Sequence, residues 1–277
     1  MTDRSGHHNF SDEAHWTAVA DGYERWVEPS TAQFARAALS LSGGVERGER
    51  VLDVAAGTGA LTLAAAEAGA RVLATDISRG MVARLRERLQ PFAGCEARVM
   101  DGQALEVEDA SFDASFSVFG VMMFPDWRRG MAELVRAIRP GGRVIVAAWA
   151  NPEGAGPMPL FLEVYRRVFP EATILPSPPG MSVLCSREGL RAEMVRAGCG
   201  EVAVHAVGGV WTWPSVEHVM RDIDEILRLA PHFSALDDDG RARLNGPLRA
   251  AIEPCAEPGG AVRVPTTANI AIGRKTG

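Results

Sequence analysis

The sequence predicts an α/β protein in which a mostly parallel, seven-stranded sheet has helices on both faces and a helical cap over the carboxyl ends of its strands. Three observations predict this class. Short apolar runs alternate with helical patterns from Val51 to Trp149, an order that builds parallel strands joined by crossover helices. A glycine-containing turn, residues 55–59, follows the first strand. A helical segment from Pro214 to Pro258 separates the last two expected strands and is longer than a hairpin connection needs.

Composition restricts the classes of function. The 277 residues favour one large α/β domain with embellishments, with two domains as the alternative. No apolar run reaches the length of a membrane span, and the N-terminal residues lack the apolar core of a signal peptide, so we expect a cytoplasmic location. The net charge of −6 argues against a nucleic-acid partner. The four cysteines form no C-x-x-C pair and the six histidines show no ligand spacing, so we expect no metal site.

The stretch from Val51 to Asp76 forms the predicted βαβ unit around which the chain is organised. Val51–Val54 has the apolar pattern of a buried parallel strand, and residues 55–59 are small enough for a sharp turn into a helix that ends at Gly69. A second strand then places Asp76 at its carboxyl end. A helix N-terminus suits an anionic group, and an acid at the next strand end accepts hydrogen bonds from ribose hydroxyls. The unit therefore predicts a nucleotide site.

The glycine pattern argues against one class of nucleotide. A dinucleotide fingerprint, G-x-G-x-x-G, needs a third glycine three positions after Gly59, where this chain has Thr62. The glycine set is therefore incomplete for a dinucleotide.

Periodicity and terminating residues predict the remaining elements. Pro29 is expected to end the first helix, and Ser78 and Asp126 are expected to begin two others. The N-terminal helices either pack on the core or also cover the ligand as a lid, and these two interpretations are compatible. The further predicted strands are residues 95–100, 112–119, 144–149, 201–211 and 262–272, and the helices are 11–28, 31–41, 78–89, 126–139, 160–169, 187–197, 216–227 and 239–252, after a mobile tail, Met1–Ser11.

The segment Asp53-Val54-Ala55-Ala56-Gly57-Thr58-Gly59 resembles the first motif, [DE]-x-G-x-G-x-G, of the class I S-adenosylmethionine-dependent methyltransferases. Asp76 matches the ribose-binding acid of that family, and Asp101–Leu105 matches its adenine-contacting segment. The chain departs from the motif at Ala55, where the pattern has its first glycine. Alanine still permits close approach of the cofactor if its φ is negative.

The resemblance extends through Phe112–Phe119 and the Arg139-Pro140-Gly141-Gly142 turn, and the branch it resembles most includes the ubiquinone/menaquinone C-methyltransferases. It implies a Rossmann-like core that binds S-adenosylmethionine and acts on a small-molecule methyl acceptor. The implied division is an N-terminal lid, 1–45, a core, 46–213 and 259–277, and a cap, 214–258. We expect a monomer or a homodimer.

The resemblance also implies roles for individual residues. Gly57 and Gly59 admit the aminoacyl part of the cofactor, Asp53 holds the loop and the cofactor ammonium, and Asp76 takes the ribose hydroxyls. Ile77 packs beside the purine, while Asp101 accepts from the adenine amino group. The complete expected cofactor-binding set is Tyr23, Asp53, Ala55, Gly57, Gly59, Asp76, Ile77, Met81, Asp101, Gly102, Gln103, Ala104 and Phe119.

The apolar loop after the fourth strand, Phe119–Pro125, is the expected place for the methyl acceptor. Its lack of polar side chains favours an apolar or aromatic acceptor, and plain core packing is the alternative. The expected substrate-pocket residues are Trp26, Met122, Met123 and Phe124. No catalytic residue is predicted, because the only natural base candidates, His15, His205, His218 and His232, fall in no catalytic pattern.

The leading hypothesis is thus a small-molecule methyltransferase acting on an O, N or C atom. Two alternatives stay open. One is a protein that binds S-adenosylmethionine without transferring methyl, such as a cyclase or a regulatory module. The other is a nicotinamide-dependent oxidoreductase, which Thr62, Asp101 and the Pro140-Gly141-Gly142 segment disfavour.

Overall fold

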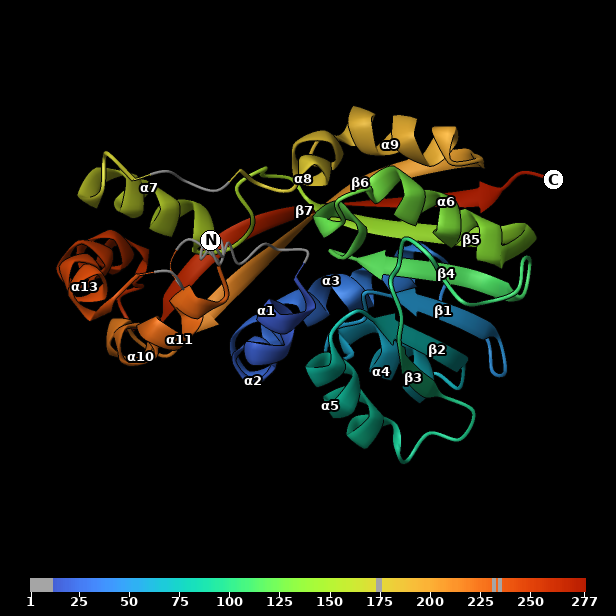
Figure 1. The fold of residues 1–277 in the computed structure, drawn as a ribbon, viewed down its shortest axis with the longest axis horizontal. Helices are drawn as coiled ribbons and strands as arrows, with labels where there is room; N and C mark the ends of the chain where they lie inside the picture. The colour runs from blue at the N-terminus through green and yellow to red at the C-terminus, as the bar shows by residue number, and fades with distance from the viewer. Residues whose placement is uncertain (1–11, 173–175, 231–232, 234–235) are drawn as a thin grey trace, which may run out of the picture.

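The computed structural model describes residues 12–172, 176–230, 233 and 236–277, and shows the α/β fold that the sequence predicts. One seven-stranded sheet has the order β3-β2-β1-β4-β5-β7-β6 (Figure 1). Strands β1 to β5 pair in parallel, whereas β7 runs antiparallel to both β5 and β6. The strands are β1 Arg50–Val54, β2 Arg71–Asp76, β3 Glu96–Val99, β4 Phe112–Val118, β5 Ile138–Trp149, β6 Cys199–Trp213 and β7 Val262–Lys275.

Helices cover both faces of this sheet. Helices α3 and α4 pack on each other, and α6 and α9 pack together over β4 to β7 on the opposite face (Figure 1). The α-helices are α1 Glu13–Ala18, α2 Ala20–Gly22, α3 Glu28–Leu41, α4 Ala60–Glu67, α5 Arg79–Leu89, α6 Trp127–Ala137, α7 Met158–Val168, α8 Pro179–Leu184, α9 Arg187–Arg196, α10 Val216–Arg221, α11 Ile223–Arg228 and α13 Asp238–Ile252. Short π and 3-10 turns are η1 Tyr23–Val27, η2 Val121–Met123 and η3 Glu253–Cys255.

The predicted helix starts are confirmed by their caps. The Ser78 hydroxyl accepts a hydrogen bond from the Met81 amide, and the Asp126 carboxylate accepts one from the Arg129 amide. Such caps satisfy backbone donors that have no partner inside the helix. One capping residue in the sequence was therefore enough to predict where each of these two helices starts.

Several predicted boundaries are wrong, among them those of the first helix, residues 11–28, where the structure has α1, α2 and η1. Pro29 does not end a helix but lies in the first turn of α3, where a missing N–H has no cost because that donor has no intrahelical partner. The expected helix 216–227 is divided at Asp222 into α10 and α11. Strand β5 begins at Ile138, before the glycine turn, and a register shift in β4 between Phe112 and Ala114 accommodates the extra residues.

The core lies on both faces of the central strands. Phe34 of α3, Phe116 of β4 and Ile145 of β5 are fully buried, and burial of each such side chain contributes roughly 1.5–3 kcal/mol. This continuous core makes the sheet a rigid base from which the loops at its carboxyl edge project.

Strands β6 and β7 continue past the end of β5 as a two-stranded ribbon. Strand β5 pairs with β7 only as far as Ala268, whereas β6 pairs with β7 out to Trp213 and Val262. The helices α10, α11 and α13 connect the far ends of this ribbon, at the same end of the molecule as α1 and α2 (Figure 1). The Gln33 side-chain amide of α3 bonds both backbone groups of Val210 and so pairs with the edge of the ribbon.

Within the described ranges, no helix is both long and apolar enough to cross a membrane, and no His, Cys, Asp and Glu side chains cluster as metal ligands would. The expected tail, Met1–Ser11, and the histidine at position 232 lie outside the described residues.

Candidate functional site

A cavity of about 440 Å³ opens at the carboxyl edge of the sheet, where parallel α/β folds bind ligands. Its walls come from the ends of β1, β2 and β4, from the N-terminal helices, and from the β6–β7 ribbon with its helical connection. A volume of this order is typical of small-molecule sites. The predicted residues that line it are Tyr23, Trp26, Ala55, Gly57, Asp76, Ile77, Met81, Asp101, Gly102, Gln103, Phe119, Met123 and Phe124.

The loop between β1 and α4 forms the floor of the cavity. Its residues Ala55, Gly57 and Gly59 all have positive φ, at 57°, 57° and 108°. Gly57 fits closely, because a Cβ added there would lie 3.4 Å from Cε1 of Tyr23. Ala55 does not satisfy the expected condition of a negative φ, so this departure from the family motif places an alanine in a region that favours glycine.

Asp76 at the end of β2 holds this loop in place. Its Oδ2 accepts a 2.8 Å hydrogen bond from the Gly57 amide, and its Oδ1 accepts one of 2.9 Å from Ser78. Burial, the largest cause, raises the pKa of Asp76, while these backbone donors oppose the rise. Each oxygen keeps a further lone pair, so the carboxylate can still accept hydrogen bonds from a ribose.

Asp53 lies behind the loop and does not line the cavity. Its carboxylate accepts a 2.6 Å hydrogen bond from the Thr62 hydroxyl of α4 and is 2% exposed. Burial raises the pKa of Asp53 to about 7, with the Thr62 hydrogen bond opposing the rise and the charge of Asp76 adding to it. Thr62 occupies the position of the third glycine in a dinucleotide-binding fold, and here its hydroxyl joins α4 to β1 through Asp53.

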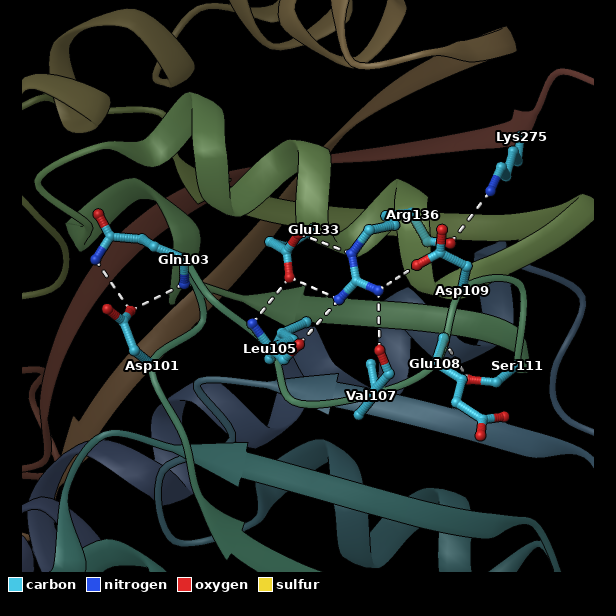
Figure 2. Close-up of polar contacts among 10 residues, drawn as sticks. All are labelled: Asp101, Gln103, Leu105, Val107, Glu108, Asp109, Ser111, Glu133, Arg136 and Lys275. Atoms are coloured by element: carbon cyan, nitrogen blue, oxygen red, sulfur yellow. Dashed lines mark hydrogen bonds and ion pairs between the residues drawn. The ribbon is translucent and has the colours of Figure 1, made fainter.

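Asp101 and Gln103 form a turn on the β3 side of the cavity. Asp101 Oδ1 accepts hydrogen bonds from the backbone and the side-chain amide of Gln103 (Figure 2). Gln103 in turn accepts from the Asp126 amide at the start of α6. Gly102 between them lies under the ring of Phe124, where an added Cβ would approach to 2.5 Å.

The chain after this turn is clamped to α6 by one arginine. Arg136 donates to the carbonyl oxygens of Leu105 and Val107 and pairs with Glu133 and Asp109 (Figure 2). Glu133 also accepts from the Leu105 amide. The clamp fixes the path of residues 105–109 and so the position of the turn that precedes them.

The N-terminal helices close the opposite wall. Tyr23 lies in the π turn η1, and burial raises its pKa well above the ordinary value, with nearby Glu28 and Asp76 adding to the effect. Glu28 is buried, accepts two 2.7 Å hydrogen bonds from Arg88 of α5 and accepts one from the Thr58 hydroxyl. These contacts join the N-terminal helices both to α5 and to the loop after β1.

Four predicted site residues lie outside the cavity wall. Asp53 lies behind the loop, and Gly59 is the N-cap of α4, where an added Cβ would meet Leu85 at 2.4 Å. Ala104 contributes its amide to the carbonyl oxygen of Asp101. Met122 is in the core under α8, with 1% exposure. Their parts in ligand binding stay predictions.

Much of the wall was not predicted from the sequence. It comes from the β5–α7 loop and from the ribbon, whose tryptophans are distant in sequence from the βαβ unit. The Gly- and Pro-rich composition of residues 151–159 was the available signal for the loop. The lining residues that were missed are Trp16, Val27, Thr31, Met100, Val118, Trp149, Glu153, Gly154, Ala155, Pro157, Met158, Leu162, Ser177, Met181, Trp211, Trp213, Ile226, Leu229 and Ala230.

None of the three described histidines lines the cavity. His15 is buried with its Nε2 3.4 Å from the Leu229 carbonyl oxygen, His218 bonds Ser215, and His205 lies on β6. Among the described lining residues the ionisable side chains are Tyr23 and three carboxylates, Asp76, Asp101 and Glu153, with no lysine, arginine or histidine.

The fold is that of the class I S-adenosylmethionine-dependent methyltransferases, and residues 52–146 match the family described as "Methyltransferase domain". The chain therefore contains a domain of that family, which confirms the resemblance found in the sequence. It is 35% identical over 150 residues to a demethylmenaquinone methyltransferase of Clavibacter sepedonicus, a match that covers 53% of this chain and 60% of the relative's length.

Solved structures agree in fold. A protein from an antibiotic biosynthesis pathway of Anabaena variabilis superposes with a TM-score of 0.61 at 17% identity, over 86% of this chain and 96% of that one. A phosphoethanolamine N-methyltransferase of Haemonchus contortus, in complex with S-adenosylhomocysteine, superposes with a TM-score of 0.53 at 19% identity, over 88% of this chain and 53% of that one.

Proposed function

We propose that this protein transfers a methyl group from S-adenosylmethionine to a small, apolar or aromatic molecule. The observation that carries the proposal is the hydrogen bond between Gly57 and Asp76, which places the loop after β1 and the acid after β2 on one side of a single cavity. The loop would admit the aminoacyl part, Asp76 the ribose, and Asp101 with Gln103 the adenine.

The residues present fit this cofactor. Gly57 lines the cavity with a φ of 57°, a conformation that glycine adopts readily, and its lack of a side chain lets a ligand approach the loop backbone closely. When bound, the cofactor supplies an electrophilic methyl group on a sulfonium. The chain's own contribution is to orient the two molecules and exclude water, and good alignment is worth on the order of 7–11 kcal/mol of barrier.

The acceptor would occupy the other half of the cavity, toward β5 and the ribbon. Trp26, Met123 and Phe124 line the cavity together with Trp211 and Trp213 of the ribbon. Apolar and aromatic walls favour an acceptor of the same kind, and the similarity to a demethylmenaquinone methyltransferase supports a quinone-like ring system.

We also propose that residues 1–45 act as a lid and 214–258 as a cap. Glu225 of α11 accepts a 2.8 Å hydrogen bond from the Trp26 indole and pairs with Arg25 at 3.2 Å. This contact joins the two segments beside the cavity. A cytoplasmic location, a monomeric or homodimeric state and the absence of a nucleic-acid partner stay predictions, and light scattering on the purified protein measures the second.

The test is formation of S-adenosylhomocysteine, followed by chromatography, with 1,4-dihydroxynaphthalene as acceptor. We expect product that carries one added methyl group. Cofactor binding without release of S-adenosylhomocysteine from any naphthol or quinol would favour the non-methylating alternative. Binding of NADH instead of S-adenosylmethionine would favour the oxidoreductase.

A further inference from the structure

The acceptor half of the cavity has one ionisable side chain among its described residues, Glu153. Asp76 and Asp101 follow β2 and β3 and so belong to the cofactor half. Glu153 follows β5, on the side of the sheet where β7 and β6 continue as the ribbon. The walls around it are aromatic, aliphatic or thioether side chains, among them Trp211, Met158 and Leu162.

The Glu153 loop is held by contacts on both sides. The Asn151 carboxamide oxygen accepts a 2.8 Å hydrogen bond from the Glu153 amide, and the Asn151 carbonyl oxygen accepts one from Gly154. Gly156 lies flat on the indole of Trp211, because an added Cβ would be 2.5 Å from its Cδ2. The loop therefore has a defined position over the ribbon.

The carboxylate of Glu153 is also oriented. Arg166 of α7 donates a 2.6 Å hydrogen bond to Glu153 Oε1, and Arg166 lies one turn beyond Leu162 and two turns beyond Met158, which line the cavity. Glu153 Oε2 accepts no hydrogen bond from the described residues, and the Glu153 side chain is 36% exposed. A carboxylate with a free oxygen accepts hydrogen bonds from a hydroxyl and repels an anion.

We propose that Glu153 is a specificity-determining residue that accepts a hydrogen bond from a hydroxyl group of an uncharged aromatic acceptor and excludes anionic acceptors. The inference rests on the proposed function, since it assigns the acceptor half of the same cavity. Glu153 positions the acceptor's hydroxyl, while the aromatic walls hold its ring. No lysine or arginine is among the described lining residues, and Arg166, outside the lining, is already paired with Glu153, so no cation there is free to pair with a carboxylate or phosphate on the acceptor.

The test uses the protein saturated with S-adenosylhomocysteine and three probes that share one ring system: 1-naphthol, 1-methoxynaphthalene and 1-naphthoate. Binding is measured by calorimetry and by tryptophan fluorescence, since Trp16, Trp26, Trp149, Trp211 and Trp213 line the cavity. We expect 1-naphthol to bind about tenfold tighter than 1-methoxynaphthalene, as for a hydrogen bond to a charged group, and 1-naphthoate to bind weakest.

The variant Glu153→Leu should bind 1-naphthol and 1-methoxynaphthalene with equal affinity. The variants Glu153→Leu and Glu153→Gln should each bind 1-naphthoate more tightly than the wild-type protein does. Glu163→Gln, which removes an exposed carboxylate of α7 outside the cavity, should keep the wild-type order. Arg166→Gln should also keep the preference for the hydroxyl, because Glu153 remains.

Titration with S-adenosylhomocysteine separates the two proposals. If neither the wild-type protein nor the variants bind it, the proposed function fails. If they bind it but the wild-type protein does not distinguish 1-naphthol from 1-methoxynaphthalene, or Glu153→Leu keeps the preference, the role of Glu153 is overturned. Failure of all three probes to bind the loaded wild-type protein would equally overturn it.

Discussion

The methyl group of Ala55 occupies the space that Gly120 leaves open. A Cβ added to Gly120 would lie 2.4 Å from the Ala55 Cβ. The loop after β1 has an alanine with positive φ at position 55, and its methyl group fits only if the residue at position 120, after β4, is small. Two loops that both line the cavity are thus fitted to each other at residues separated by more than sixty positions.

The Ala55→Gly variant should be more stable than the wild-type protein by about 0.5–1 kcal/mol. The substitution removes the cost of holding alanine in a left-handed conformation, roughly 1–2 kcal/mol. Part of this gain is offset because glycine raises the conformational entropy of the unfolded chain. Gly120→Ala should destabilise by about 1–3 kcal/mol through overpacking. Urea unfolding of both single variants and the double variant measures this. Because the two side chains would compete for one space, Ala55→Gly should recover part of the Gly120→Ala loss, and strict additivity of the two effects would contradict this packing.

The buried Asp53 should make stability depend on pH. Its folded pKa is raised to about 7, so between about pH 4 and pH 7 the folded state holds a proton that the unfolded state has lost. The contribution of Asp53 to stability is therefore largest at low pH and decreases as the pH rises through 7. Asp53→Asn keeps an acceptor for Thr62 without a titrating group.

Between pH 5 and pH 8 the stability of Asp53→Asn relative to the wild-type protein should therefore rise, by about 1–3 kcal/mol in total. Urea unfolding at unit steps of pH measures the difference. Asp109→Asn, at a carboxylate whose side chain is 77% exposed, is the matched control and should show little such trend. A pH-independent difference for Asp53→Asn would contradict the assignment.

Replacement of Arg136 should loosen the adenine side of the site. Arg136→Met leaves the carbonyl oxygens of Leu105 and Val107 without their donor, and we expect a loss of about 2–3 kcal/mol in unfolding free energy. Hydrogen exchange should increase at residues 101–109 before it increases in the central strands. Arg139→Met, which removes a more exposed pair with Asp113, is the control and should change stability by less than about 1 kcal/mol. Equal effects of the two substitutions on stability and exchange would show that the contacts of Arg136 do not hold residues 101–109 in place.

Glu28 should hold the N-terminal helices on the core. The Glu28→Gln variant removes the charge that faces Arg88 and Thr58. Loss of one partner of a fully buried ion pair costs up to about 3–5 kcal/mol of unfolding free energy. We expect a smaller loss here, because Arg88 is 31% exposed. Amide exchange in α1 to α3 should accelerate. Arg25→Gln breaks a pair that is 64% and 37% exposed and should leave the exchange nearly unchanged. The assignment fails if exchange in α1 to α3 is the same in Glu28→Gln as in the wild-type protein.

The βαβ unit and the alternation of strands and helices that follows it could be predicted from local sequence, because apolar runs, the residue 55–59 turn and caps such as Ser78 determine structure over a few residues. The acceptor half could not. Trp211 lies in Gly208–Trp213, the part of β6 that extends past the end of β5, and the register of this part depends on pairing with β7, some fifty residues later. The positive φ at Ala55 was also not predicted from local sequence, and Gly120, which leaves space for the Ala55 methyl group, is more than sixty positions away in the chain.

Calorimetric titration with S-adenosylmethionine, comparing the wild-type protein with Asp76→Asn and Asp76→Ala, is the sharpest test that Asp76 binds the cofactor ribose at this edge of the sheet. We expect binding by the wild-type protein and a loss of about a hundredfold in Asp76→Ala, since hydrogen bonds to a charged acceptor contribute roughly 1.5–3 kcal/mol each. Asp76→Asn should fall between the two, with thermal unfolding confirming that each variant is folded. No binding by the wild-type protein at millimolar cofactor, or equal affinity in folded Asp76→Ala, would contradict this role of Asp76.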